Sequence, residues 1–398
     1  MKKHLLLFIL LISISAVHAQ WFIQNGGINI GQIRDSYFLN ENTGWLLVDG
    51  NKTYLTSDGG DTWNCIDTMS CFIDEIFFVD ILNGWGTGGN KIINTQDGGH
   101  SWSIQYENID SIFYQQYRDV FFTDLNHGWV VGYDTVLITT NGGNLWQPVK
   151  IDLWLPWSVF FLDQNIGWIA GDDGKIIKTT DGGNTWINKP TSSSGEFHDI
   201  TFTDQNNGWI AGTEWISGWQ SIVLKTSDGG ENWNYTLLPG AQTLYSVSFS
   251  DSLNGWMCGS YGTLWHTQNG GNTWELQTTP TSNYLYTINF VNQNTGWATG
   301  MYGTIMKTNN GGIVGLDQDI TTNMNDIEVF PNPASYQIYF ETSENLIRVE
   351  LYNITGENVW NEKLCSENTI NISNLVKGVY LIKLYSENNV RIKKIIKE

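Results

Sequence analysis

Cysteine and metal-binding motifs are scarce in this 398-residue sequence. Its four cysteines are too few to form a disulfide framework in a chain of this length. Cys65 and Cys71 are close enough to close a small loop in an oxidising compartment, but their spacing fits two free thiols equally well. No CxxC, HExxH or His-rich spacing occurs, so we expect no metal and no cofactor.

Basic residues are also few. The chain has 20 Lys and Arg against 40 Asp and Glu, and residues 20–315 have 10 against 28, a net charge of −18. Such a surface repels phosphate backbones and anionic lipids. Nucleic acid is therefore not expected as a partner.

Long apolar runs are absent after the N-terminus. Residues 1–19 combine Lys2 and Lys3 with an apolar run from Leu5 to Ile14 and small residues ending at Ala19, which is typical of a signal peptide. No later segment approaches the roughly 20 apolar residues of a transmembrane helix. We expect an exported, soluble monomer without a membrane span.

A repeat of about 40 residues dominates the sequence. Six boxes similar to TSDGGDTW end at Trp63, Trp102, Trp146, Trp186, Trp233 and Trp274, and a seventh, TNNGG, ends at Gly312 without its Trp. A Gly-Trp pair precedes each box, at Trp45, Trp85, Trp129, Trp168, Trp209, Trp256 and Trp297. Seven copies of each element predict seven structural units.

Each unit contains four short stretches with strand patterns, separated by Asn-Gly and Gly-Gly turns, and no sustained helical period. Four-stranded sheets repeated radially form a β-propeller. The seventh unit lacks its outer strand, whereas WFIQ at Trp21–Gln24 resembles the outer strands that start at Trp102 and Trp274. We therefore predict that residues 21–24 complete the last blade and close the ring.

The T-x-D-G-G-x-T-W box, an Asp-box (BNR-like) variant, combined with F-x-D-x-N-x-G-W-x-x-G, resembles the photosystem II stability and assembly factor family and its non-photosynthetic relatives. The resemblance covers all seven repeats and implies an all-β, seven-bladed propeller over residues 20–315. Asp boxes also occur in sialidases, sortilin-type receptors and xyloglucan hydrolases, so the resemblance implies a fold and not an activity.

The C-terminal part has a different pattern. A polar linker, residues 316–325, leads to FPNP at Phe330–Pro333, then Gly356, then GVY at Gly378–Tyr380 and a basic last strand. Residues 326–398 resemble the type A sorting domain of the type IX secretion system, a small β-sandwich. The resemblance implies a Bacteroidota-type organism, the type IX machinery as a partner, and delivery to the cell surface or the medium. It leaves open whether the domain is cleaved.

The acidic positions of the boxes favour a structural role over a catalytic one. A carboxylate can cap backbone amides in such a turn, and Asn, which replaces the acid in three boxes, can accept the same bonds. The seven positions are Asp58, Asp97, Asn141, Asp181, Asp228, Asn269 and Asn310. A sialidase would need three arginines around the substrate carboxylate, but the propeller has only Arg34 and Arg118. We identify no catalytic residue.

The candidate binding site is a set of positions that vary in chemistry within a repeated framework. They lie four residues before the phenylalanine of each innermost strand, where the chain enters the strand nearest the axis: Arg34, Asp74, Arg118, Trp157, His198, Tyr245 and Tyr286. We expect them to ring the mouth of the central channel, opposite the boxes. They could equally be solvated strand starts. The arginines could meet a ligand or neighbours such as Asp35, Asp74 and Asp119.

Trp215 and Trp219 lie in the longest loop expected on the same face and could bind a ligand or pack on a neighbouring loop. Two hypotheses for function follow. The preferred one is a secreted or surface-exposed, non-enzymatic propeller that binds proteins or peptides or acts as a scaffold. The alternative is a carbohydrate-active module, either a glycan-binding protein or a weak glycoside hydrolase.

Overall fold

The computed structural model describes residues 21–24, 30–49, 51–69, 71–109, 116–240, 242–312, 328–341, 346–353, 358–362, 369–386 and 390–398. The predicted signal peptide and the predicted linker lie outside these residues. The chain divides into two compact units, residues 1–314 and 315–398. Within the described residues no helix is long and apolar enough to cross a membrane.

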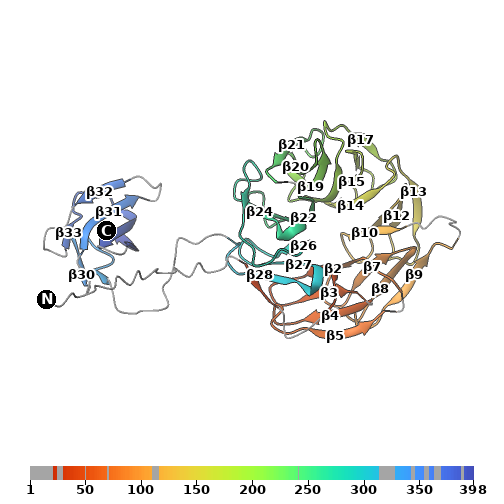
Figure 1. Cartoon of the computed structure of the whole chain (residues 1–398), viewed down its shortest axis with the longest axis horizontal. Coiled ribbons are helices and arrows are strands. Elements are labelled where there is room, and N and C mark those ends of the chain that lie inside the picture. Colours follow the sequence, from red (N-terminus) through yellow and green to blue (C-terminus); the bar gives the residue numbers. More distant parts are fainter. Residues whose placement is uncertain are drawn as a thin grey trace, which may run out of the picture. The chain divides into compact units, whose positions relative to one another are not determined.

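The first unit is a β-propeller of seven four-stranded antiparallel sheets, as predicted (Figure 1). Blade 1 contains β2 (Ile33–Phe38), β3 (Gly44–Val48), β4 (Lys52–Thr56) and β5 (Asn64–Thr68). Blade 2 contains β6 (Glu75–Phe78), β7 (Gly84–Gly88), β8 (Lys91–Thr95) and β9 (Ser103–Glu107). Blade 3 contains β10 (Tyr117–Phe122), β11 (Gly128–Gly132), β12 (Thr135–Thr139) and β13 (Gln147–Lys150). Blade 4 contains β14 (Pro156–Phe161), β15 (Gly167–Gly171), β16 (Ile176–Thr179) and β17 (Ile187–Lys189).

The other three blades follow the same order. Blade 5 contains β18 (Glu196–Phe202), β19 (Gly208–Trp215), β20 (Trp219–Thr226) and β21 (Asn234–Leu238). Blade 6 contains β22 (Leu244–Phe249), β23 (Gly255–Gly259), β24 (Leu264–Thr267) and β25 (Glu275–Leu276). Blade 7 contains β26 (Leu285–Phe290), β27 (Gly296–Gly300), β28 (Ile305–Thr308) and β1 (Phe22–Ile23). Two 3₁₀ turns, η1 (Ser260–Gly262) and η2 (Met301–Gly303), join the second and third strands of blades 6 and 7.

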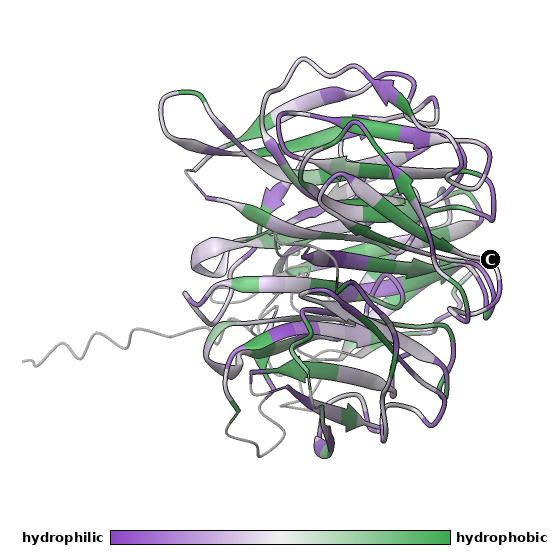
Figure 2. Ribbon diagram, turned by 90° about the vertical axis from the view of Figure 1, so that its right-hand side faces the viewer, coloured by the Kyte–Doolittle hydropathy of each residue, from purple (hydrophilic) through white to green (hydrophobic). Residues whose placement is uncertain are grey.

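Stacked aromatic pairs hold neighbouring blades together. The tryptophan of each Gly-Trp pair stacks on the last phenylalanine of the next blade's innermost strand, with ring centroids 3.5–3.8 Å apart. Trp297 of blade 7 stacks on Phe38 of blade 1, so the series closes on itself. The glycine before the tryptophan is required by space: a Cβ at Gly44 would lie 2.4 Å from the Phe38 ring. The apolar segments in the side view therefore lie on strands that pack between blades (Figure 2).

The boxes form the turns at the opposite end of each blade from the channel mouth. Thr56 Oγ1 donates to Asp58 Oδ1 and accepts from the Gly60 amide, each at 2.8 Å, and Asp58 Oδ1 accepts from the Thr62 amide at 2.9 Å. The box at Asn141 makes the same bonds: Thr139 Oγ1 donates to Asn141 Oδ1 and accepts from the Gly143 amide, and Asn141 Oδ1 accepts from the Leu145 amide. Because an amide does here what a carboxylate does, the box contacts require no acid.

The predicted ring closure is confirmed. β1 pairs antiparallel with β28, with Phe22 opposite Lys307, and the Gln24 amide donates to the Ile305 carbonyl at 2.8 Å. Trp21 is fully buried, meets Phe290 edge to face at 5.7 Å and donates from Nε1 to Gln277 Oε1. It therefore occupies the place of a box tryptophan in blade 7.

The second unit is also entirely β in its described residues. One sheet contains β29 (Glu328–Phe330), β30 (Gln337–Glu341) and β33 (Thr369–Asn371), and the other contains β32 (Asn358–Glu362), β31 (Leu346–Asn353), β34 (Gly378–Ser386) and β35 (Val390–Lys397). The two share a buried apolar core that includes Ile338, Val349 and Ile382. This unit therefore has a core of its own.

The disulfide left open between Cys65 and Cys71 is not formed. Both residues are free thiols. Cys65 is exposed on the outer strand β5, and its sulfur faces the Asp67 carbonyl at 3.7 Å. Cys65 lies within β5, whereas Cys71 follows the end of that strand, so their proximity in the sequence did not produce a bond.

Candidate functional site

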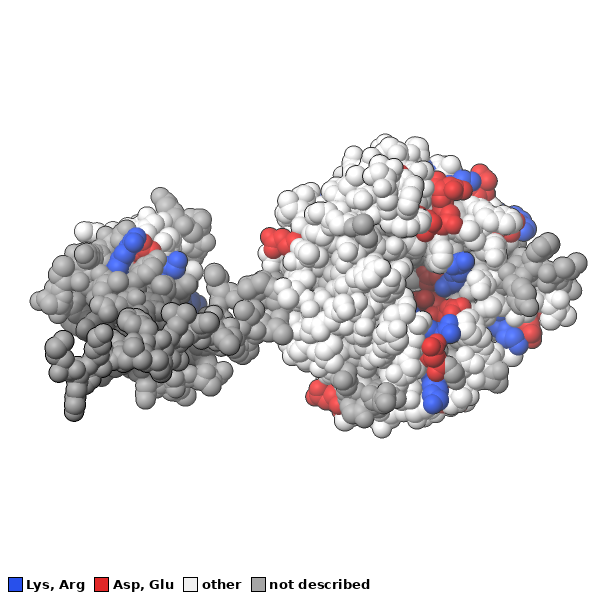
Figure 3. Space-filling view, in the orientation of Figure 1, with Lys and Arg blue, Asp and Glu red and all other residues white. Residues whose placement is uncertain are grey.

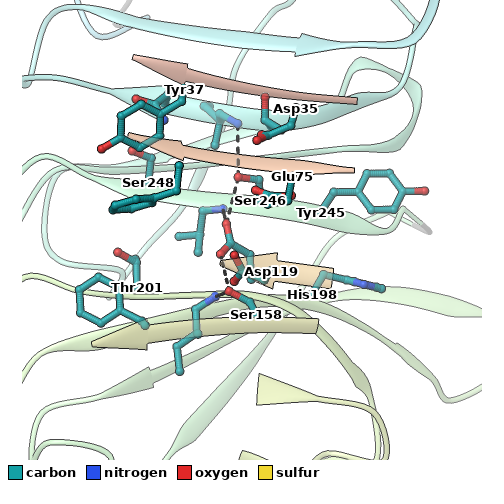
Figure 4. Close-up of a pocket in the computed structure, with 18 of the residues that line it drawn as sticks. Asp35, Tyr37, Glu75, Asp119, Ser158, His198, Thr201, Tyr245, Ser246 and Ser248 are labelled. Carbon is teal, nitrogen blue, oxygen red and sulfur yellow. Dashed lines mark hydrogen bonds between the residues drawn. The ribbon is translucent and has the colours of Figure 1, made fainter. Parts of the chain in front are cut away.

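A central channel with a volume of about 300 Å³ runs between the innermost strands of the blades. Its lining includes four of the seven predicted ring residues, Trp157, His198, Tyr245 and Tyr286. In Figure 4, His198 and Tyr245 extend toward one end of the channel, while Tyr37 and Thr201 lie toward the other. We call the end that contains the ring residues the channel mouth, and the face around it the mouth face.

Carboxyl groups that line the channel next to the ring residues join neighbouring blades through hydrogen bonds. They are Asp35, Glu75, Asp119 and Asp199, and Figure 4 shows the first three in succession along the wall. Asp35 Oδ2 accepts from the Ile76 amide of the next blade at 2.9 Å. Asp119 and Asp199 accept in the same way from Val159 at 2.7 Å and Val247 at 2.8 Å. These bonds form a belt between neighbouring innermost strands.

The sequence analysis missed this belt. Its members directly follow the predicted ring positions in the repeat, and the remaining blades have Ser158, Ser246 and Thr287 at that place. The signal in the sequence was a set of equivalent repeat positions whose residues can all accept hydrogen bonds. The greater chemical variety of the neighbouring ring positions hid this signal.

Burial changes the ionisation of the belt. It raises the pKa of Asp199 to about 7 and that of Asp119 to about 6, although amide hydrogen bonds oppose the shift. Burial also raises the pKa values of Asp35 and Glu75, which share a hydrogen bond and repel each other when both are charged. The belt is therefore partly protonated near neutral pH.

The two propeller arginines have different surroundings. Arg34 forms ion pairs with Asp49 at 2.9 Å and Asp74 at 2.8 Å, and its guanidinium lies 4.2 Å from the centre of the Phe72 ring. It therefore links the hairpin of its own blade to the start of the next blade. Its expected neighbour Asp35 faces the belt instead.

Arg118 has no ion pair in the part of the chain that the structure describes. Its guanidinium lies 3.8 Å from the centre of the Trp157 ring, and its Nε is buried without a hydrogen-bond partner. Trp157 is held in turn by a hydrogen bond from its Nε1 to Asp172. Burial lowers the pKa of Arg118, but an arginine stays charged at neutral pH.

The ring continues with aromatic residues. His198 packs between Trp157 and Tyr245, with centroids 5.3 Å and 5.8 Å away, and burial together with Arg118 lowers its pKa to about 4. The imidazole is thus neutral at pH 7, with its buried Nε2 lacking a hydrogen-bond partner. Tyr245 then meets Tyr286 at 5.6 Å. The positions predicted from the repeat alignment thus form contacts from Arg118 to Tyr286.

Trp215 and Trp219 end the long β19–β20 hairpin, on the same side of the propeller as the other turns between second and third strands. Their rings meet edge to face at 5.2 Å, and 63% and 44% of their surfaces remain exposed. They therefore pack on each other and keep much of their surface exposed.

Charge is unevenly distributed over the mouth face. A band of acidic and basic side chains crosses it past the channel mouth, whereas the part toward β24 and β28 is almost free of charge (Figure 3). The described residues contain no group of three or more His, Cys, Asp or Glu side chains placed to hold a metal ion.

Two family models match the chain. The model described as photosynthesis system II assembly factor YCF48 matches overlapping segments that together span residues 65–314. The secretion system C-terminal sorting domain matches residues 328–398. No curated protein sequence matches.

Solved structures show the same fold. YCF48 bound to a D1 peptide superposes with a TM-score of 0.59 at 20% identity, over 73% of this chain and 96% of that chain. PorZ, a surface component of the type IX secretion system of Porphyromonas gingivalis, gives 0.55 at 11% identity, over 94% and 60%. A xyloglucanase from Xanthomonas campestris gives 0.57 at 10% identity, over 82% and 60%.

Proposed function

Because the chain belongs to the photosynthesis system II assembly factor YCF48 family, with a secretion-system sorting domain after the propeller, we propose that it is a non-enzymatic peptide-binding module displayed outside the cell. The ligand lies at the channel mouth. The sorting domain delivers the chain to the surface or the medium through the type IX machinery.

The observation that carries this proposal is the guanidinium of Arg118, which lies on the Trp157 ring and has a buried Nε without a hydrogen-bond partner. Buried polar atoms are normally hydrogen-bonded, and leaving one without a partner costs about 1–3 kcal/mol. Arg118 is oriented by Trp157, and Asp172 and Asp74 act on its charge, but no described carboxylate is close enough to form an ion pair with it. A ligand carboxylate at the mouth would complete this site.

The solved YCF48 structure supports a peptide as the ligand, because that propeller is bound to a D1 peptide. Its identity to this chain is low, so the peptide sequence is not transferred. The residues of the ring favour a peptide that has a carboxylate at its end and aromatic side chains beside it. The carboxylate would meet Arg118, and the aromatic side chains would meet Trp157.

The absence of catalysis is part of the proposal. The belt carboxyls have raised pKa values that could suit acid or base chemistry. However, Asp35, Asp119 and Asp199 are each engaged by the backbone amide of the next blade. Their structural bonds account for their presence without a substrate.

An array of peptides, each synthesised with a free C-terminal carboxylate and as the amide, tests the proposal. We expect the full chain to bind a subset of the carboxylates. Arg118→Gln should weaken that binding by about 2 kcal/mol, roughly 30-fold, which is typical of losing one charge-assisted contact. Equal binding of acids and amides, or unchanged binding by Arg118→Gln, would contradict it.

A further inference from the structure

The ends of blades 6 and 7 on the mouth face contain no charged residue, although the propeller as a whole is acidic. Four segments build this region, residues 239–248, 257–266, 277–288 and 298–305, and none contains Asp, Glu, Lys or Arg. They are instead rich in Thr, Ser, Asn, Gln and Tyr. The uncharged part of the mouth face in Figure 3 lies over these blades.

Five tyrosines lie in this region, and we call them the tyrosine platform: Tyr245, Tyr261, Tyr284, Tyr286 and Tyr302. Tyr284 meets Tyr261 at 5.1 Å and Tyr245 at 6.3 Å, and Tyr245 meets Tyr286 at 5.6 Å. Tyr302 lies within electrostatic reach of Tyr286. The nearest charged group that acts on the platform is Asp49, which is already paired with Arg34.

Two of these tyrosines are exposed on backbone that disfavours them. Tyr261 and Tyr302 have φ angles of 57° and 55°, with 61% and 76% of their surfaces exposed. The corresponding turns of blades 1 and 4 place Asn51 and Asp173 in this conformation, which suits their short polar side chains. Blade 3 has Tyr133 at positive φ, and that ring packs edge to face on Trp154 at 5.7 Å. A bulky ring gains little burial at such a position, and Tyr261 contacts the rim of the fold through Tyr284.

We propose that the tyrosine platform binds a neutral oligosaccharide. Exposed aromatic faces stack on the apolar faces of sugar rings, while tyrosine hydroxyls and neighbouring amides match sugar hydroxyl groups. The absence of charged side chains from these segments fits an uncharged ligand. Equivalent turns on adjacent blades would let Tyr261 and Tyr302 meet successive sugars of one chain.

Tyr261→Asn combined with Tyr302→Asn tests the proposal without threatening the fold. Asn is comfortable at positive φ, so the double variant should melt at the same temperature as the parent or higher. The full chain should bind neutral glucan, mannan or xyloglucan oligosaccharides on a glycan array. By isothermal titration, the double variant should bind its selected oligosaccharide about tenfold more weakly, or not at all.

Tyr235→Asn is the matched control, because Tyr235 is an exposed tyrosine on the outer strand β21, away from the platform. It should leave glycan binding intact. Binding only to sialylated, sulfated or uronate glycans, binding to none, or undiminished binding by the double variant would overturn the proposal. So would capture of proline-rich peptides, and not glycans, through the same tyrosines. Arg118→Gln should not alter glycan binding, so this site and the peptide site can fail independently.

Discussion

At the scale of single residues, two arginines at equivalent positions of the repeat have different roles. Arg34 has two carboxylate partners from neighbouring segments, whereas Arg118 has a tryptophan face and no carboxylate partner among the described residues. Position in the repeat therefore does not determine function. The neighbours supplied by adjacent loops do.

This difference predicts opposite phenotypes. Arg34→Gln should lower the free energy of unfolding by about 1 kcal/mol, since its ion pairs are partly exposed and screened, and should leave peptide binding nearly unchanged. Arg118→Gln should leave the melting temperature nearly unchanged. Calorimetry on the two variants measures both, and a larger stability loss for Arg118→Gln than for Arg34→Gln would contradict the assignment.

The belt carboxyls predict a pH effect. Their folded pKa values lie above the unfolded values, so the folded state holds more protons than the unfolded state between about pH 4 and 7. Their contribution to stability is thus fully present below about pH 4, falls as pH rises from there, and is lost once pH has passed through the folded pKa values of about 6 and 7. We expect a lower melting temperature at pH 8 than at pH 6.

Glu75→Gln should reduce this fall between pH 6 and 8, because glutamine can still bond to Asp35 without adding a second negative charge. Asp58→Asn is the control, since bonding to Thr62 holds the pKa of Asp58 at about 2, far below the tested range. An equally steep fall in Glu75→Gln and in the parent would show that the Asp35–Glu75 pair does not titrate there.

At the scale of elements, the blade pattern was predictable and the side-chain partners were not. Seven copies of Gly-Trp and of the box identified seven blades, and WFIQ at Trp21–Gln24 identified the closing strand, because each motif encodes a local turn or strand. The ion pair between Arg34 and Asp74 joins segments of two blades, and its geometry depends on the twist between them. The belt was hidden for the same reason, since its bonds run from one blade to the next.

Deletion of Trp21–Gln24 should destabilise the whole ring. Blade 7 would lose its outer strand, and Phe290 and Gln277 would lose the fully buried Trp21, a change that costs about 3–5 kcal/mol for a large aromatic in a core. Thermal unfolding followed by circular dichroism measures the loss. A parent-like melting temperature would show that the ring does not depend on this strand.

At the scale of the whole molecule, the two units have separate cores and separate family matches. Removal of residues 326–398 should therefore leave the propeller folded and able to bind peptide, but should abolish export. Fractionation of a type IX-competent host that expresses both forms tests this. Normal amounts of the truncated chain in the medium would contradict the sorting role.

We propose that the peptide binds to the mouth face and not to the face formed by the boxes. Hydrogen exchange of the full chain, measured with and without the peptide selected on the array, shows which face becomes protected. We predict slower exchange in the strand starts at residues 117–119 and 156–159, which contain Arg118 and Trp157. Protection confined to the box turns, such as residues 58–62 and 181–185, with no change at the strand starts, would contradict it.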